Sequence, residues 1–141
     1  SEVFLDGFDI IDMTYPETLE IETKVVVGKG QKLEVGFPAG LLSWALTFIR
    51  DLRASKDVEK KPSVRASLGV YERSQANAML AGRKQVTMQD IEDIMVSVVS
   101  HRITLKPSVR YTQSPEEFVN NEFQRFKNNR PMAEEQRGGD L

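Results

Sequence analysis

Apolar side chains recur at helical spacing through most of the chain after Pro38. Positions three and four residues apart share one face of an α-helix, so these repeats predict amphipathic helices that pack on a common core. We predict helices over about 39–54, 62–82, 87–102 and 115–127. The expected core positions are Leu41, Leu42, Ala45, Phe48, Ile49, Leu52, Val64, Leu68, Tyr71, Ala78, Met79, Ile91, Ile94, Met95, Val98, Val119, Phe123 and Phe126.

Capping signals mark the ends of these helices. Thr87 precedes Asp90 by three residues, which is a variant of the capping box that begins a helix. Ser114 is followed by a proline and two glutamates, the usual composition of a first helical turn. Gly82 is a natural helix stop. The polar segment 55–61 is expected to be a solvated loop.

The first 37 residues give a weaker pattern. Residues 8–13 suit a short strand that ends before Pro16. Apolar and polar residues alternate strictly over 19–25, and by period alone this favours a strand. The same segment, opened by Pro16 and rich in early acidic residues, suits a helix equally well. The residue pattern therefore leaves both alternatives open.

Length and composition are those of one ordinary globular domain. The chain has 141 residues, of which 40% are hydrophobic and 28% charged, with a net charge of -2. This charge provides no global field for nucleic acid, and no apolar run reaches the length of a membrane span. The lack of cysteine excludes disulfides, thiolate nucleophiles and sulfur-ligated metals. We expect a cytoplasmic protein without membrane or nucleic-acid partners, and the missing initiator Met indicates a piece of a longer protein.

Residues that could carry catalysis have simpler structural roles. His101 is the single histidine, expected as a cation near a helix C-terminus. The carboxylates of Asp90, Glu92 and Asp93 are expected to cap a helix and face water. Residues 28–32 contain two glycines and two lysines but lack the spacing and hydroxyl of a phosphate-binding loop. We therefore expect no catalytic residue and no metal site in this chain, and no ATP hydrolysis by the chain alone.

Two features remain as candidate binding sites. Arg65 lies in the first turn of the second predicted helix, where the helix dipole disfavours a cation unless an anion binds there. From the pattern alone, an ordinary surface arginine is the simpler interpretation. Phe118, Phe123 and Phe126 lie on the last predicted helix, which needs something to cover it. They form a candidate docking face for a partner.

Residues 61–103 resemble the lid of MoxR-type AAA+ ATPases and, more distantly, of the magnesium chelatase ATPase subunit. Residues 61–67 read Lys-Pro-Ser-Val-Arg-Ala-Ser, which is similar to the sensor-2 segment of that family. Residues 82–91 resemble its Gly-Arg, Val-Thr, Asp-Val pattern, with Asp90-Ile91 at the last pair, and 100–103 resemble its His-Arg pair. The resemblance implies that Arg65 is the sensor-2 arginine, which contacts the γ-phosphate of ATP from the lid.

The segments 4–9 and 15–17 resemble the end of the AAA+ core, which implies a helix over about 16–27. Gly7 stands where the family carries an arginine that reaches the neighbouring subunit, so no arginine finger is assigned. The implied domains are the end of the core at 1–15, the helical lid at 16–127 and a disordered tail at 128–141.

The resemblance implies an all-α bundle of four or five helices, with a short N-terminal remnant of the α/β core. As the lid of a hexameric chaperone-type ATPase, it would couple ATP hydrolysis to remodelling of client proteins or to metal-cofactor insertion. ATP and Mg²⁺ would belong to the parent protein, an ATP hydrolase, and not to the chain alone. Its partners would be the parent's core, neighbouring subunits of a homo-oligomeric ring, and clients. The alternative is a stand-alone adaptor that binds a partner through Phe118, Phe123 and Phe126.

Overall fold

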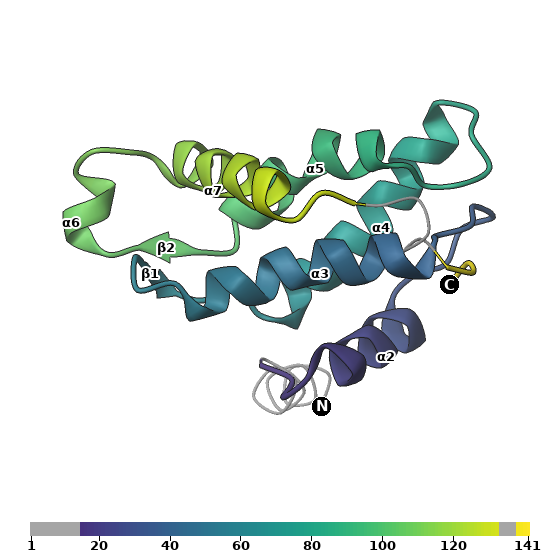
Figure 1. The fold of residues 1–141 in the computed structure, drawn as a ribbon, viewed down its shortest axis with the longest axis horizontal. Helices are drawn as coiled ribbons and strands as arrows, with labels where there is room; N and C mark the ends of the chain where they lie inside the picture. Colours follow the sequence, from purple (N-terminus) through teal and green to yellow (C-terminus); the bar gives the residue numbers. More distant parts are fainter. Residues whose placement is uncertain (1–14, 133–137) are drawn as a thin grey trace, which may run out of the picture.

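The computed structural model describes residues 15–132 and 138–141, and α-helices dominate it (Figure 1). The expectations for the strand at 8–13 and for Gly7 lie outside these residues. The prediction of an all-α bundle is confirmed. The elements are α2 (Leu19–Lys29), α3 (Ala39–Ala54), β1 (Val58–Lys60), α4 (Val64–Leu80), α5 (Met88–Ser100), β2 (Thr104–Leu105), α6 (Pro107–Arg110) and α7 (Pro115–Asn129).

The bundle is organised around α3, with α2 on one side of it and α7 on the other (Figure 1). Helix α4 packs against α5, α2 and α3, and α5 also contacts α7. The core positions expected in α3, α5 and α7 are all buried. In α4 the prediction is wrong at Met79, which is 44% exposed. The buried face of α4 passes through Ser74 and Ala78, and Met79 lies about 100° around the helix from Ala78.

Residues 19–29 form a helix, so the strand suggested by the alternating pattern is wrong and the helix implied by the resemblance is confirmed. Thr18 caps it, because its hydroxyl accepts a hydrogen bond from the Ile21 amide at 3.1 Å. Its fully buried positions are Glu22 and Val26, which are four residues apart, whereas Ile21 is 46% exposed. A carboxylate therefore occupies the buried face of α2.

The segment 55–61 is not simply a solvated loop. It contains β1, which pairs antiparallel with β2 in a two-stranded sheet, with Val58 opposite Leu105. Both of these side chains are buried, so the small sheet closes one end of the core. Helix α6 follows β2 and lies beyond that end of the bundle (Figure 1).

The C-terminal residues that the structure describes are bonded to the bundle, contrary to the expectation of a disordered tail from 128. Helix α7 continues to Asn129. The Ala39 amide donates to the Gly139 carbonyl at 2.6 Å, and the Leu141 amide donates to the Phe37 carbonyl at 2.6 Å. Residues 138–141 therefore lie against the start of α3, near the loop that follows α2 (Figure 1).

The predicted cap of α7 is present as a reciprocal capping box. The Glu117 amide donates to Ser114 Oγ at 3.1 Å, and the Ser114 amide donates to Glu117 Oε1 at 2.9 Å. We expect Ser114→Ala to lower the free energy of unfolding by about 1 kcal/mol, measured by urea denaturation, because one amide of the first turn loses its partner. Ser108→Ala, at an exposed position in α6, is the control, and equal effects of the two substitutions would contradict the capping role.

Candidate functional site

Arg65 occupies the first turn of α4, as predicted. Ser63 is the N-cap, and its hydroxyl accepts a hydrogen bond from the Arg65 amide at 3.2 Å. The Arg65 side chain is exposed, and within residues 15–132 and 138–141 it makes no ion pair. The first turn of α4 contains no acidic residue. The positive end of the helix and an uncompensated guanidinium therefore coincide, an arrangement that favours an anionic ligand.

The loop that leads into α4 is held by two basic side chains. Arg53, near the end of α3, donates from Nε to the Pro62 carbonyl at 2.7 Å. Lys61 Nζ donates to the carbonyls of Ser55 and Val58, the latter at 2.7 Å. Pro62 is itself buried. The residue immediately before the N-cap of α4 is thus fixed to α3 by a charged hydrogen bond.

Arg53 also pairs with a buried carboxylate on α2. Its Nη1 and Nη2 atoms each lie 2.6 Å from an oxygen of Glu22, in the bidentate geometry that suits a guanidinium. Arg50 Nη1 donates to the same carboxylate at 2.8 Å, and Ser67 Oγ of α4 donates to it at 2.5 Å. We call Glu22, Arg50, Arg53 and Ser67 the Glu22 network. It joins α2, α3 and α4 through one carboxylate that is 0% exposed.

Two opposing effects act on the Glu22 carboxyl. Burial by itself would raise its pKa, since the charged form loses water. The hydrogen bonds from Arg53 and Ser67, the charge of Arg53 and the bond from Arg50 outweigh burial, so the pKa lies below the ordinary value of 4.5. Glu22 is therefore a permanent anion at neutral pH, and it compensates the two arginines of the network.

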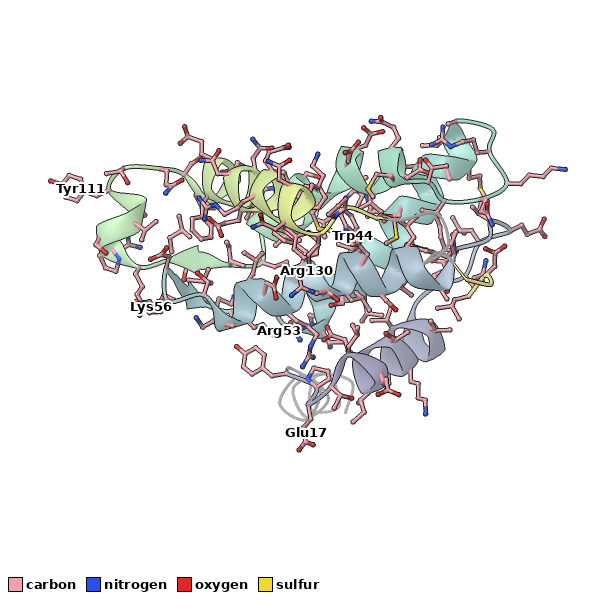
Figure 2. The ribbon with its side chains drawn as sticks, viewed as in Figure 1. Glu17, Trp44, Arg53, Lys56, Tyr111 and Arg130 are labelled. Carbon is pink, nitrogen blue, oxygen red and sulfur yellow. The ribbon has the colours of Figure 1, made fainter. Side chains whose placement is uncertain are left out.

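The Glu22 network extends to the segment that precedes α2. Arg50 Nη1 also donates to the Pro16 carbonyl at 2.8 Å, and Arg50 Nη2 donates to the Glu17 carbonyl at 2.9 Å. The Arg53 guanidinium lies 5.8 Å from the centroid of the Tyr15 ring, and Figure 2 shows it pointing from α3 toward the start of α2. A pocket of about 430 Å³ opens here, lined by Tyr15, Pro16, Arg50, Arg53, Ala54 and Lys61.

The residue pattern does not reveal this network. Arg50 and Arg53 fall within the helix predicted over 39–54, but nothing in the sequence assigns them a partner. The missing partner is Glu22, because the pattern over 19–25 fits a strand and a helix equally well. With a helix there, Glu22 and Val26 share a face, and a carboxylate four residues from an apolar core position is the available signal.

The chain itself covers the aromatic cluster on α7. The prediction that these three phenylalanines form a docking face for a partner is therefore wrong. Phe118 and Phe123 are each 2% exposed and Phe126 is 6% exposed. Trp44 and Phe48 of α3 pack on Phe123 and Phe126, with ring centroids 5.0–5.7 Å apart. Figure 2 shows Trp44 between α3 and α7, where its Nε1 donates to the Arg130 carbonyl at 2.6 Å. The adaptor hypothesis thereby loses its binding surface.

The clustered carboxylates of α5 have structural roles. Asp90 is fully buried, accepts from the Thr87 amide at 2.8 Å and pairs with Arg83, so the predicted cap is present. Asp93 accepts from Asn77 at 3.0 Å, and Glu92 pairs with Lys127 at 2.9 Å.

Neither the single histidine nor any other group among the described residues adds a further candidate site. His101 is exposed at the C-cap of α5, the position predicted for it. In the described part of the chain, no three acidic or histidine side chains are grouped to hold a metal ion. No helix there has the length and apolar character needed to cross a bilayer.

Comparison with known proteins agrees with this geometry. A family model described as the AAA lid domain matches residues 50–122, more than half of the chain. The fold is similar to that of a "putative ATPase" from Cytophaga hutchinsonii ATCC 33406, with a TM-score of 0.59 and 18% sequence identity. That similarity covers 64% of this chain and 31% of the other, so this chain spans about a third of that ATPase. A search of curated proteins found no match.

Proposed function

Because the chain belongs to the AAA lid domain family, we propose that it is the nucleotide-sensing lid of a MoxR-type AAA+ ATPase. The observation that carries this proposal is the position of Arg65. It is an exposed cation on the first turn of α4, and no acidic side chain of the described residues neutralises it. An arginine presented in this way suits bidentate contact with a phosphate group.

In this proposal Arg65 contacts the γ-phosphate of ATP that is bound, with Mg²⁺, by the core of the parent protein. A cation directed at the transferring phosphoryl group stabilises the charge that it carries in the transition state. Binding of ATP would draw the lid toward the core, and loss of the γ-phosphate would release it. In a cytoplasmic ring of such subunits, repeated closure would drive remodelling of client proteins, including those that await a metal cofactor.

The coding sequence upstream of Ser1 gives the first test of this proposal. We expect an in-frame Gly-x-x-x-x-Gly-Lys-Ser/Thr motif there, because the lid acts on a nucleotide that a phosphate-binding loop must hold. A start codon directly before Ser1 would contradict the lid function, since no core would then precede the lid in the same chain.

The purified 141-residue chain is expected to release no phosphate from ATP. It contains neither the phosphate-binding loop nor the acidic residues that would hold Mg²⁺ in such an ATPase, so nothing positions the nucleotide. The measurement is phosphate release in the presence of Mg²⁺, with the full-length protein as the positive control. Turnover by the purified chain, at a rate that follows its concentration through a final chromatography step, would show the lid assignment to be wrong.

A further inference from the structure

Arg53 lies where three parts of the structure meet: the start of α4, the buried carboxylate of α2 and the end of α3. We propose that Arg53 is a positioning residue for Arg65, and that the Glu22 network transmits movement of the segment at Pro16 and Glu17 to the start of α4. This inference rests on the proposed nucleotide-sensing function of Arg65. It assigns to the network a role beyond stabilising the bundle.

The guanidinium of Arg53 bonds to two parts of the chain at once. Its Nε atom binds the Pro62 carbonyl at 2.7 Å while its two terminal nitrogens bind the two oxygens of Glu22 at 2.6 Å. A single planar guanidinium thus fixes Pro62 and Glu22 relative to one another. A lysine could retain the charge, but it could not make these three directed bonds from one rigid group.

The path along the chain from Pro62 to Arg65 is short. Pro62 directly precedes the N-cap Ser63, whose carbonyl accepts from the Ala66 amide at 3.0 Å and whose hydroxyl accepts from the Arg65 amide. The peptide that Arg53 holds is therefore bonded into the first turn of α4. A shift of this peptide would change where the Arg65 guanidinium lies relative to a bound nucleotide.

The loop before α4 also has supports that do not depend on Arg53. Lys61 Nζ binds the carbonyls of Ser55 and Val58, and Val58 pairs with Leu105 in the small sheet. Loss of the bond between Arg53 and Pro62 should therefore alter the position of the α4 N-terminus without unfolding the loop. This separates a positioning role from a purely structural one.

The Glu22 network also reaches the segment before α2 through Arg50. Arg50 shares the Glu22 carboxylate with Arg53 and also donates to the Pro16 and Glu17 carbonyls. The backbone at 16–17 and the backbone at Pro62 are thus joined through two arginines and one buried carboxylate. Because the Glu22 carboxylate is 0% exposed, water has little access to the bonds that this carboxylate accepts, which stiffens the centre of the connection.

The experiment is a double-mutant cycle in the full-length ATPase, with Arg53→Lys, Arg65→Ala and the double variant. We expect Arg53→Lys to lower kcat about tenfold with little change in KM for ATP, since a small misplacement of a phosphate-binding group costs rate. In the Arg65→Ala background, Arg53→Lys should have no further effect, because the two act through one contact. Arg125→Lys, at an exposed surface pair, is the matched control and should leave kcat unchanged.

The outcomes distinguish this inference from the proposed function. If Arg65→Ala lowers turnover but the effect of Arg53→Lys multiplies with it, Arg53 acts independently and the positioning role is wrong. A loss of turnover caused by partial unfolding would also multiply with that of Arg65→Ala, so the cycle distinguishes it from positioning. If Arg65→Ala leaves turnover unchanged, the proposed function itself is wrong. If Arg53→Lys does not fold, Arg50→Lys, at a more exposed position, replaces it. It should likewise have no further effect in the Arg65→Ala background. Effects of the two substitutions that multiply would again overturn the inference.

Discussion

Arg65→Ala in the full-length ATPase is expected to lower ATP turnover about 100-fold, the usual effect of removing one group that stabilises transition-state charge. The loss should appear in kcat more than in KM, because the γ-phosphate contact strengthens as charge redistributes during transfer. The fold should survive. Arg65 is exposed and unpaired within the described residues, and a cation at a helix N-terminus slightly destabilises the helix.

The matched control is Arg73→Ala, which removes another exposed arginine from the same helix, about two turns beyond Arg65. Steady-state turnover and thermal unfolding should be measured for both variants. We expect Arg73→Ala to retain full turnover and both variants to keep the melting temperature within about 3 °C. Equal turnover of Arg65→Ala and the unmodified protein would remove the observation on which the proposed function rests.

Helices α3, α4, α5 and α7 could be predicted from sequence because several signals agreed in each. In α3 the apolar residues from Leu41 to Leu52 mark one broad face, and a proline stands before it. In α5 and α7 the N-caps, Thr87 and Ser114, are each followed three residues later by an acidic residue. When period, caps and turn residues agree, local sequence determines the element.

Helix α2 shows why the signals in a segment must agree before its structure can be predicted. Leu19, Ile21 and Val25 alternate with polar residues and imitate a strand, while the helical face is marked only by Glu22 and Val26. A carboxylate is buried there only because two arginines from a different helix compensate its charge. Those arginines lie 28 and 31 residues away in sequence, so no local pattern could reveal them. The resemblance to a family predicted the helix where residue periodicity did not.

The candidate sites likewise include features that the sequence predicts and features that it does not. The position of Arg65 on a first turn follows from Ser63 and the repeat that begins at Val64, so sequence could place it. Whether the rings of α7 face solvent depended on which helix packs against them, and α3 precedes α7 by some 60 residues. The pairing of β1 with β2 also joins residues far apart in sequence, with Val58 opposite Leu105. Long-range packing decided both of these features.

Glu22→Gln is expected to lower the free energy of unfolding of the 141-residue chain by about 3 kcal/mol at pH 7, since it leaves two arginines without their buried counter-charge. The pKa of Glu22 is lower in the folded chain than its ordinary value of 4.5. Its stabilisation is therefore complete above about pH 4.5 and is lost as the pH falls through the folded pKa. The difference between the two proteins should shrink in that window, because protonated Glu22 and Gln are nearly isosteric and both uncharged.

Urea denaturation of both proteins at a series of pH values from 7 downward measures this difference. Glu122→Gln is the matched control, because Glu122 pairs with Arg125 at the surface and its loss should cost less than about 1 kcal/mol at any pH. The difference in free energy of unfolding between Glu22→Gln and the unmodified chain could instead stay constant as the pH falls below 4.5. That result would mean that the shape of the Glu22 side chain, and not its charge, is important. The electrostatic connection from Pro16 through Arg53 to Pro62 would then have no basis. A difference in free energy of unfolding that disappears as the pH falls would instead identify the ionised carboxylate as the group that holds α2, α3 and α4 together.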